Sequence, residues 1–479
     1  MTKHFFSIVV WIGSIILISA CSHQNNLQTF NGYYYGGQNA KAYKYAKSKA
    51  GKNGDVLWNL QASVSAFSLA REDKDLFGLL EQGETLFSKY EAEGLMGGAL
   101  GNFGAVLVNE NIKTYRGNIY EGVMFNYYKA LYAMSQNDYA RARVEFNRAN
   151  DRQRRAKDYF RKDIQKALDE QSQQNAKDKT LSQVDVSSSN RSISPILQKE
   201  YSNLKNFQAY EGFINPAVSY VSALFFMTEG DFAKATDLYK ESYGINAAQV
   251  ITQDLQVLQN RKNGKNTTYT WLIIEDGKSA FKNDTSINIS SFYVSNDVLH
   301  IGISIPTLQA GKIAARNYST QNESGETFKA YEISDLDSVI ASEFQKQLPF
   351  ILTRAISSAI LKASTQAILG DRLGTAGALA GMLYSMGTTS ADVRISTALP
   401  KRVLALQIPN NSGHFVFKAD ETPLYNVYFD CQKSEQFLQE KRKNRAKVIV
   451  LCQNYDNILY FRIKDNNPTY RILKGGESE

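Results

Sequence analysis

The first residue that could carry chemistry is Cys21, which ends an apolar run near the start of the chain. A lysine and a histidine precede the run from Phe5 to Leu17, and small side chains stand directly before the cysteine. A charged start, an apolar stretch and small residues at a cleavage point are typical of an export signal. An uncut membrane anchor is the alternative, but the stretch is shorter than the roughly 20 residues that cross a bilayer. We therefore expect removal of residues 1–20.

Ile18-Ser19-Ala20-Cys21 resembles the lipobox of bacterial lipoproteins. This resemblance implies that Cys21 becomes the first residue and is acylated with fatty chains such as palmitate, and two or three such chains anchor a protein stably. Ser22 stands where an aspartate would resemble the inner-membrane retention signal of enteric bacteria. The resemblance therefore implies a lipid anchor in the bacterial outer membrane, on the periplasmic side rather than the surface. In a single-membrane bacterium the protein would lie outside the plasma membrane.

Cys431 and Cys452 are the other two cysteines of the chain. An exported chain reaches an oxidising compartment, where disulfides form. Each of the two cysteines ends a strand-like segment, and a bridge would close a loop of about 20 residues and stabilise the fold by roughly 3 kcal/mol. The Cα atoms would then lie within about 7 Å, which excludes a simple in-register antiparallel pairing of the two strands. Two buried thiols are the alternative.

Other groups that could catalyse a reaction or bind a metal give weak signals. Ser202 with Lys205, and Ser279 with Lys282, have Ser-x-x-Lys spacing, but no Lys-Thr-Gly motif follows either pair. The few histidines and cysteines lack the spacing of metal ligands. We therefore assign no catalytic residue, no metal ligand and no cofactor, and we expect a binding protein rather than an enzyme.

Charge and length narrow the class of protein further. The 479 residues carry a formal net charge of +8, which is mild for this length and suits the anionic surroundings of a cell envelope. Nucleic acid is a poor partner for an exported protein. Because single cores stop growing near 250 to 300 residues, we expect two domains or more.

Two segments of the N-terminal half repeat one spacing. Their members are Tyr139, Ala142, Phe146 and Ala149 in the first, and Phe232, Ala235, Tyr239 and Ser242 in the second. This pattern resembles the second helix of a tetratricopeptide (TPR) unit, in which small residues let two helices touch. A divergent hairpin over residues 57–90 would complete the three units that such repeats need. We expect a tether at 21–35 and a TPR-like helical repeat domain at 36–262, with a flexible insert at 172–194.

In such a domain the first helix of each unit faces the concave side. Apolar and aromatic side chains there would form a groove for a partner, because such side chains are frequent in binding hot spots. The candidates are Met124, Tyr127, Leu131, Tyr220, Leu224 and Met227. Ordinary core packing is the alternative for each of them.

The C-terminal half, residues 265–470, changes to the period of strands. Eight segments have this character: 270–275, 285–290, 298–305, 402–408, 414–418, 425–430, 447–451 and 458–463. Helical spacing between 334 and 388 separates the early strands from the late ones, so we expect an α+β domain with helices on one sheet face. The Gly/Ala-rich segment 373–391 is expected to be a core helix. The alternative is a membrane helix of a secretion- or pore-associated envelope component.

Four motifs lie along most of the mature chain: Tyr120-Glu121-Gly122-Val123, Arg148-Ala149-Asn150-Asp151, Ile274-Glu275-Asp276-Gly277 and Thr397-Ala398-Leu399-Pro400. Together they resemble a family of poorly characterised bacterial outer-membrane lipoproteins with tetratricopeptide repeats. The resemblance implies architecture and location and brings no catalytic residue. We therefore expect a lipid-anchored envelope scaffold that binds another envelope protein or a peptide, in wall or outer-membrane maintenance.

Overall fold

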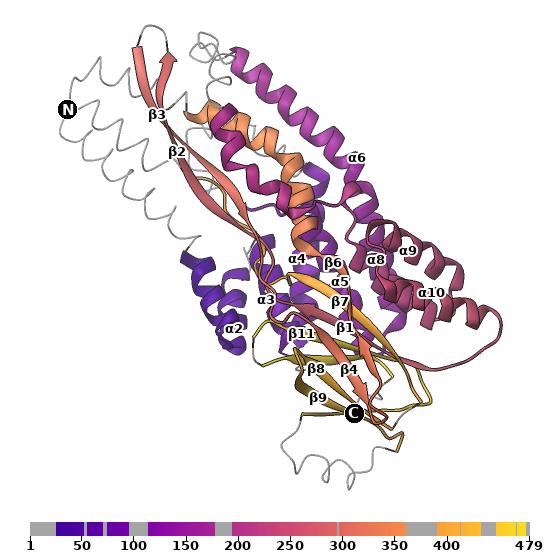
Figure 1. The fold of residues 1–479 in the computed structure, drawn as a ribbon. Coiled ribbons are helices and arrows are strands. Elements are labelled where there is room, and N and C mark those ends of the chain that lie inside the picture. Colours follow the sequence, from indigo (N-terminus) through magenta and orange to yellow (C-terminus); the bar gives the residue numbers. More distant parts are fainter. Residues whose placement is uncertain are drawn as a thin grey trace.

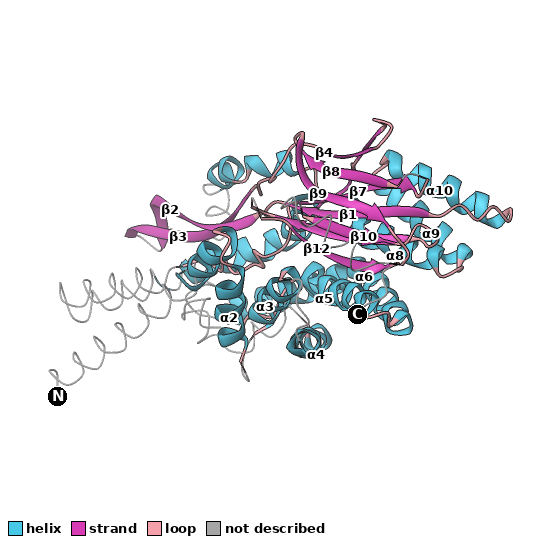
Figure 2. Ribbon diagram, turned by 90° about the horizontal axis from the view of Figure 1, so that it is seen from below, coloured by secondary structure: helices cyan, strands magenta, loops and turns pink. Residues whose placement is uncertain are grey.

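The computed structural model describes residues 25–51, 55–69, 74–94, 114–177, 194–294, 297–359, 362, 390–411, 413–432, 447–465 and 467–475. Helices form one layer of the molecule, and two sheets lie on top of them (Figures 1 and 2). The expected signal peptide and Cys21 lie outside the described residues.

The helical layer is built from consecutive helices. A helix at 25–35 precedes α2 (Asn39–Ala50), α3 (Val56–Ser68), α4 (Lys74–Glu93), α5 (Ile119–Ser135) and α6 (Tyr139–Lys177). A helix at 194–200, the 3-10 turns η5 (Ser202–Phe207) and η6 (Glu211–Phe213), and then α8 (Pro216–Thr228), α9 (Phe232–Ile245) and α10 (Gln249–Lys262) follow. A further helix covers 336–359.

The two segments with repeated spacing form two helical hairpins with the same turn chemistry. In the α5–α6 turn, Asn137 has φ +58°, and in the α8–α9 turn, Gly230 has φ +80°. Asparagine and glycine tolerate this left-handed conformation. The next residue of each turn, Asp138 or Asp231, donates its backbone N–H to a carbonyl five positions back, at 2.9 and 2.8 Å. The predicted hairpins are therefore confirmed, whereas their TPR identity stays a prediction.

Two predicted boundaries in this half are wrong. Residues 25–35 of the expected tether form a helix, whose side chains Leu27, Phe30 and Tyr34 are buried in the core. The insert was expected to begin at 172, but α6 continues to Lys177. Residues 178–193 lie outside the described part of the chain.

The strands form two five-stranded sheets and one long hairpin. The inner sheet has the order β12 (Thr469–Lys474), β11 (Asn457–Ile463), β1 (Tyr269–Asp276), β7 (Arg402–Pro409) and β6 (Tyr331–Asp335). The outer sheet has the order β10 (Val448–Leu451), β9 (Thr422–Phe429), β8 (His414–Ala419), β4 (Tyr318–Asn322) and β5 (Thr327–Lys329). The hairpin pairs β2 (Phe281–Val294) with β3 (Asp297–Gln309).

All eight predicted strands are present, and the mixed α plus β class is correct. The predicted helical region at 334–388 begins later than expected, because Ser334 and Asp335 belong to β6. Helix 336–359 follows directly. Most of the Gly/Ala-rich segment, 373–389, lies outside the described residues.

The inner sheet is buried on both faces. One face, with Trp271 and Tyr460, belongs to the same hydrophobic core as the helices. The other face, with Leu272 and Phe461, packs with outer-sheet side chains such as Phe417. The helical and strand-rich halves therefore share a core, although the change of period at 262–269 falls where it was predicted.

Candidate functional site

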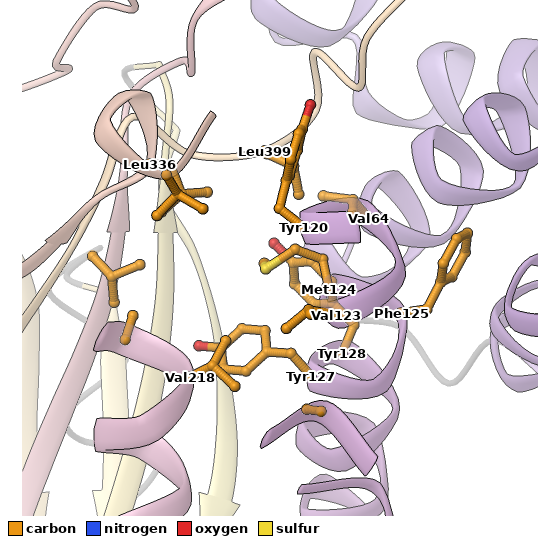
Figure 3. Close-up of a cluster of buried hydrophobic side chains, with 14 of the residues drawn as sticks. Val64, Tyr120, Val123, Met124, Phe125, Tyr127, Tyr128, Val218, Leu336 and Leu399 are labelled. Atoms are coloured by element: carbon orange, nitrogen blue, oxygen red, sulfur yellow. The ribbon is translucent and has the colours of Figure 1, made fainter. Parts of the chain in front are cut away.

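The predicted partner groove is not open in the structure. Its six residues come from α5 and α8 and are all at most 2% exposed: Met124, Tyr127, Leu131, Tyr220, Leu224 and Met227. Figure 3 shows Met124 and Tyr127 pointing from α5 toward Leu336 and Val218. This prediction is wrong in its functional part, and the alternative of core packing is right.

The inner sheet is what covers this helix face. α5 packs against β12, α8 against β6, and α10 against β7. Trp271, Ile273 and Tyr460 of the sheet share the core with the six helix residues. The chain therefore occupies its own concave face, and no partner can reach it without separating the two layers.

Buried acids join the helices to the inner sheet. The Glu275 carboxylate on β1 accepts hydrogen bonds from the hydroxyls of Tyr128 on α5 at 2.8 Å and Tyr460 on β11 at 2.7 Å. Burial raises the pKa of Glu275. The buried Arg462 guanidinium donates to the carbonyl oxygens of Gly277 at 2.8 Å and Ala398 at 3.2 Å. The sequence motifs that contain Gly277 and Ala398 thus meet at one end of the sheet.

A second joint connects α8, α10 and β1. The Asp254 carboxylate accepts hydrogen bonds from the Tyr220 hydroxyl and from Trp271 Nε1, both at 2.7 Å. Burial raises the pKa of Asp254 to about 7. Protonation near neutral pH is the way in which a buried acid avoids the cost of an uncompensated charge.

The third joint lies at the start of α5. Glu343, on helix 336–359, accepts hydrogen bonds from the backbone N–H groups of Ile119 at 2.8 Å and Tyr120 at 3.2 Å. Burial raises the pKa of Glu343 to about 8, with the nearby Glu121 carboxylate adding to the rise. All three acids are closed off from solvent, so their geometry supports a structural role.

The predicted cysteine pair is bridged. Cys431 and Cys452 form a disulfide with Cα atoms 4.2 Å apart. They follow β9 and β10, which pair in parallel with Phe429 opposite Leu451. This arrangement agrees with the sequence argument that the two strands are not a simple in-register antiparallel pair.

An open cleft lies beside this disulfide. It has a volume of about 860 Å³, and we call it the disulfide cleft. The turns of both helical hairpins and the β10–β11 turn contribute lining residues. The lining residues used below are Tyr139, Phe232, Arg261, Tyr455, Asp456 and Lys474. Of the six predicted groove residues, only Met227 borders the cleft.

Ion pairs and an exposed aromatic shape this cleft. Arg261 donates to Asp456 at 2.8 Å, and Lys474 pairs with Glu229 at 2.5 Å. Lys474 also lies 4.5 Å from the centre of the Tyr139 ring. The Tyr455 side chain is 64% exposed, the highest value among the exposed large apolar residues of the described chain.

Sequence reasoning missed Tyr455. Its signal was present in the polar segment Gln-Asn-Tyr-Asp-Asn that directly follows Cys452. Such residues form turns. An aromatic ring at the tip of a turn has little chance of being buried, and a disulfide at the base of the turn fixes its position.

No family model, curated protein or solved structure matches this chain. Within the described ranges, no group of three or more histidines, cysteines, aspartates or glutamates could hold a metal ion. Those same ranges include no helix with the length and apolar character needed to cross a membrane.

Proposed function

We propose that the chain is a lipid-anchored protein of the bacterial cell envelope that binds another envelope protein or a peptide. The observation that carries this proposal is the disulfide cleft, which is open and fixed by a covalent bond and has Tyr455 at its edge. Its location differs from that of the groove predicted from the sequence, because the concave helix face is filled.

The chemistry of the cleft suits a polypeptide partner. Aromatic and arginine side chains are enriched in the energetic centres of protein interfaces. Tyr139, Phe232 and Tyr455 supply aromatic surface, while the Arg261–Asp456 pair supplies charges of both signs. The hairpin turns contribute backbone groups that a peptide could use for hydrogen bonds.

Two further observations support the location in the envelope. The sequence ending in Cys21 resembles a lipobox, and the Cys431–Cys452 bridge is of the kind that persists in oxidising compartments. The paired hairpins with equal turns support a TPR-like repeat. We place the protein on the periplasmic side of the outer membrane. Mass spectrometry of the mature N-terminus tests this step, and an intact leader on the purified protein contradicts it.

Site-specific crosslinking tests the binding site. A photoreactive phenylalanine analogue at position 455 should crosslink in living cells to one protein, which mass spectrometry identifies. Tyr455→Ala should weaken the purified complex by roughly tenfold or more, because truncation of an aromatic hot spot costs about 2 kcal/mol or more.

Tyr243 on α9 gives a matched control, because this tyrosine is also exposed, at 43%, and does not line the cleft. The analogue at position 243 should give no crosslink to the same protein, and Tyr243→Ala should leave the affinity unchanged. Equal crosslinking from the two positions would remove the cleft from the proposal.

A further inference from the structure

The N-terminal part of the chain is strongly basic. Residues 22–54 contain five lysines and no aspartate or glutamate, and the first acidic residue of the whole chain is Asp55. Four of the lysines lie on the short helix α2, at positions 41, 44, 47 and 49. The modest net charge of +8 over the whole chain therefore conceals a concentrated positive segment next to the expected acylation site.

α2 presents these lysines on its outer side. Ala42, Ala46 and Ala50 are fully buried against the rest of the helical layer. Three lysines lie on the exposed side: Lys41, Lys44 and Lys49. Within the ranges that the structure describes, Lys41 and Lys44 make no ion pair, whereas Lys47 pairs with Asp75 on α4.

The preceding helix fixes where this basic face lies relative to the anchor. Helix 25–35 packs beside α2, and the Tyr45 hydroxyl of α2 donates to Asn26 Oδ1 at 2.8 Å. Leu27, Phe30 and Tyr34 hold helix 25–35 in the core. The C-terminal half of α2 is therefore next to the first described residues.

Chain length then limits the distance to the membrane. Cys21 precedes residue 25 by four positions, which span at most about 14 Å even when fully extended. α2 itself is about 18 Å long. An acylated Cys21 would thus keep the lysines at most a few tens of ångströms from the bilayer. This tether is short enough to let α2 lie on the surface, where its charges come within the Debye length of about 8 to 10 Å.

We propose that the lysine face of α2 binds the anionic phospholipid headgroups of the bilayer that holds the anchor. This inference deepens the proposed function and rests on its anchoring step. The phosphate charges of the headgroups complement the ammonium groups, and an acyl anchor combined with a basic patch is a known two-signal mode of membrane attachment. The helical layer then lies against the membrane along α2.

The basic run on α6 differs from α2, because several of its arginines pair with acids. Arg152 pairs with Glu91 at 3.3 Å, and Arg154 pairs with Glu241 at 3.1 Å. Arg161 pairs with Asp158 at 3.3 Å. These arginines lie beside acids, whereas lysines are the only charged residues on the exposed side of α2. Figure 1 places α2 on the opposite side of the molecule from α9 and α10.

Vesicle binding by the chain from Ser22 to Glu479, which keeps every described residue and lacks Cys21, tests the proposal. This unlipidated protein should sediment with vesicles of phosphatidylethanolamine and phosphatidylglycerol, and less with neutral phosphatidylcholine vesicles. The variant Lys41→Glu/Lys44→Glu/Lys49→Glu should bind the anionic vesicles at least about tenfold more weakly, because each basic residue near the surface contributes on the order of 1 kcal/mol.

The matched control is Lys157→Glu/Lys162→Glu/Lys240→Glu, which makes the same change of net charge with exposed lysines of α6 and α9. This control should bind like the parent protein. Equal losses of vesicle binding in the two triple variants, or unchanged vesicle binding by the α2 variant, would overturn the proposal. An acidic protein would then be the alternative partner of the lysine face. Unchanged melting temperatures verify that all the variants are folded.

The anchoring step can fail separately. Because the tested protein lacks Cys21, vesicle binding does not depend on acylation. Mass spectrometry that finds an unprocessed leader would contradict the anchor while leaving the vesicle result intact. Absence of vesicle binding, together with an acylated Cys21 in cells, would contradict only the lysine face.

Discussion

The inner and outer sheets have the same number of strands but very different surroundings. In the inner sheet, every residue of β11 is buried, as is every residue of β1 except the first. In the outer sheet, β8 and β10 alternate between buried and more exposed positions. A sheet with helices on one face and another sheet on the second face has continuous apolar strands, whereas a sheet with one wet face alternates.

Ionisable groups follow the same division. The acids that join the helices to the inner sheet, Asp254 and Glu275, have raised pKa values because burial disfavours the charged carboxylate. Asp420, in the β8–β9 turn of the outer sheet, has a lowered pKa because the backbone N–H groups of Arg316 and Asn317 donate to it. The ionisable groups of the inner sheet are therefore buried in hydrogen-bonded contacts with the helices, whereas Asp420 of the outer sheet is exposed to water.

The largest expected effect is the loss of unfolding free energy when a buried aromatic side chain of the inner sheet is removed. Trp271→Ala on the inner sheet should lower the free energy of unfolding by about 5 kcal/mol, because it opens a cavity and removes a hydrogen bond to Asp254. Tyr428→Ala on the outer sheet, where Tyr428 stacks on His414, should cost about 1 kcal/mol. Denaturant unfolding measures both losses. Equal losses would contradict the conclusion that the inner sheet is more tightly packed than the outer sheet.

The pH dependence gives the next effect. The pKa of Asp254 rises from about 3.8 to about 7 on folding, so the folded protein holds this proton more tightly than the unfolded chain. The resulting stability is full below about pH 4 and is lost as the pH rises to about 7. Asp254→Asn imitates the protonated acid, so the stability of this variant relative to the parent should increase by up to roughly 4 kcal/mol from pH 4 to pH 8.

Denaturant unfolding at several pH values measures this difference. Asp237→Asn, an exposed acid on the neighbouring helix α9, controls for the loss of a surface charge. A relative stability of Asp254→Asn that stays constant over this range would show that the Asp254 joint does not titrate as described.

The disulfide of the outer sheet comes third. Cys431→Ser combined with Cys452→Ser should lower the free energy of unfolding by about 3 kcal/mol, because the bridge closes a loop with a sequence separation of 21 residues. The inner sheet has no cysteine and should keep its protection against hydrogen exchange. Loss of protection in both sheets to the same extent would mean that they unfold as one unit.

The smallest effect is expected at Asp420. Its lowered pKa means that its contribution is present at neutral pH and is lost as the pH falls through its folded-state pKa. Because this carboxylate is exposed, Asp420→Asn should cost well under 1 kcal/mol at pH 7. Asparagine also tolerates the positive φ of this turn position, +45°. A loss as large as that at the disulfide would contradict the assignment of a solvated charge.

Strands with long apolar runs could be predicted from the sequence, and short polar ones could not. Eight strands had β-branched and aromatic residues at the right spacing. β4, β5, β6 and β12 were missed. Tyr-Ser-Thr-Gln-Asn of β4 and Thr-Phe-Lys of β5 have little apolar content, whereas Thr-Tyr-Arg-Ile-Leu-Lys of β12 did carry a strand signal. These strands exist because a neighbouring strand supplies hydrogen bonds, which is tertiary information.

The groove was mispredicted for a physical reason. An apolar helix face gives the same signal whether a partner covers it or a later part of the same chain does. The run Trp271-Leu272-Ile273-Ile274 nevertheless has no polar position, and such a strand needs a cover on both faces. Read together, the two patterns would have predicted the closed arrangement.

The expected tether also carried a readable signal. Leu27, Phe30 and Tyr34 stand three and four residues apart, which is the spacing of one helix face.

The disulfide was predictable because only two cysteines remain after Cys21. The open cleft was not predictable, because it forms where turns from distant parts of the chain meet.

The strand pairing of β1 determines how much of the chain must be synthesised before the inner sheet can form. β1 pairs with β7 on one side and, in parallel, with β11 on the other, with Thr270 opposite Asn457. A nascent chain therefore delivers α2 to α10 and β1 long before β7 and β11, the two strands that pair with β1. Such late, long-range pairing slows folding. A polypeptide that stops before residue 457 would lack one of the two neighbours of its central strand. Premature termination near the end should therefore yield an aggregating product rather than a shorter working one.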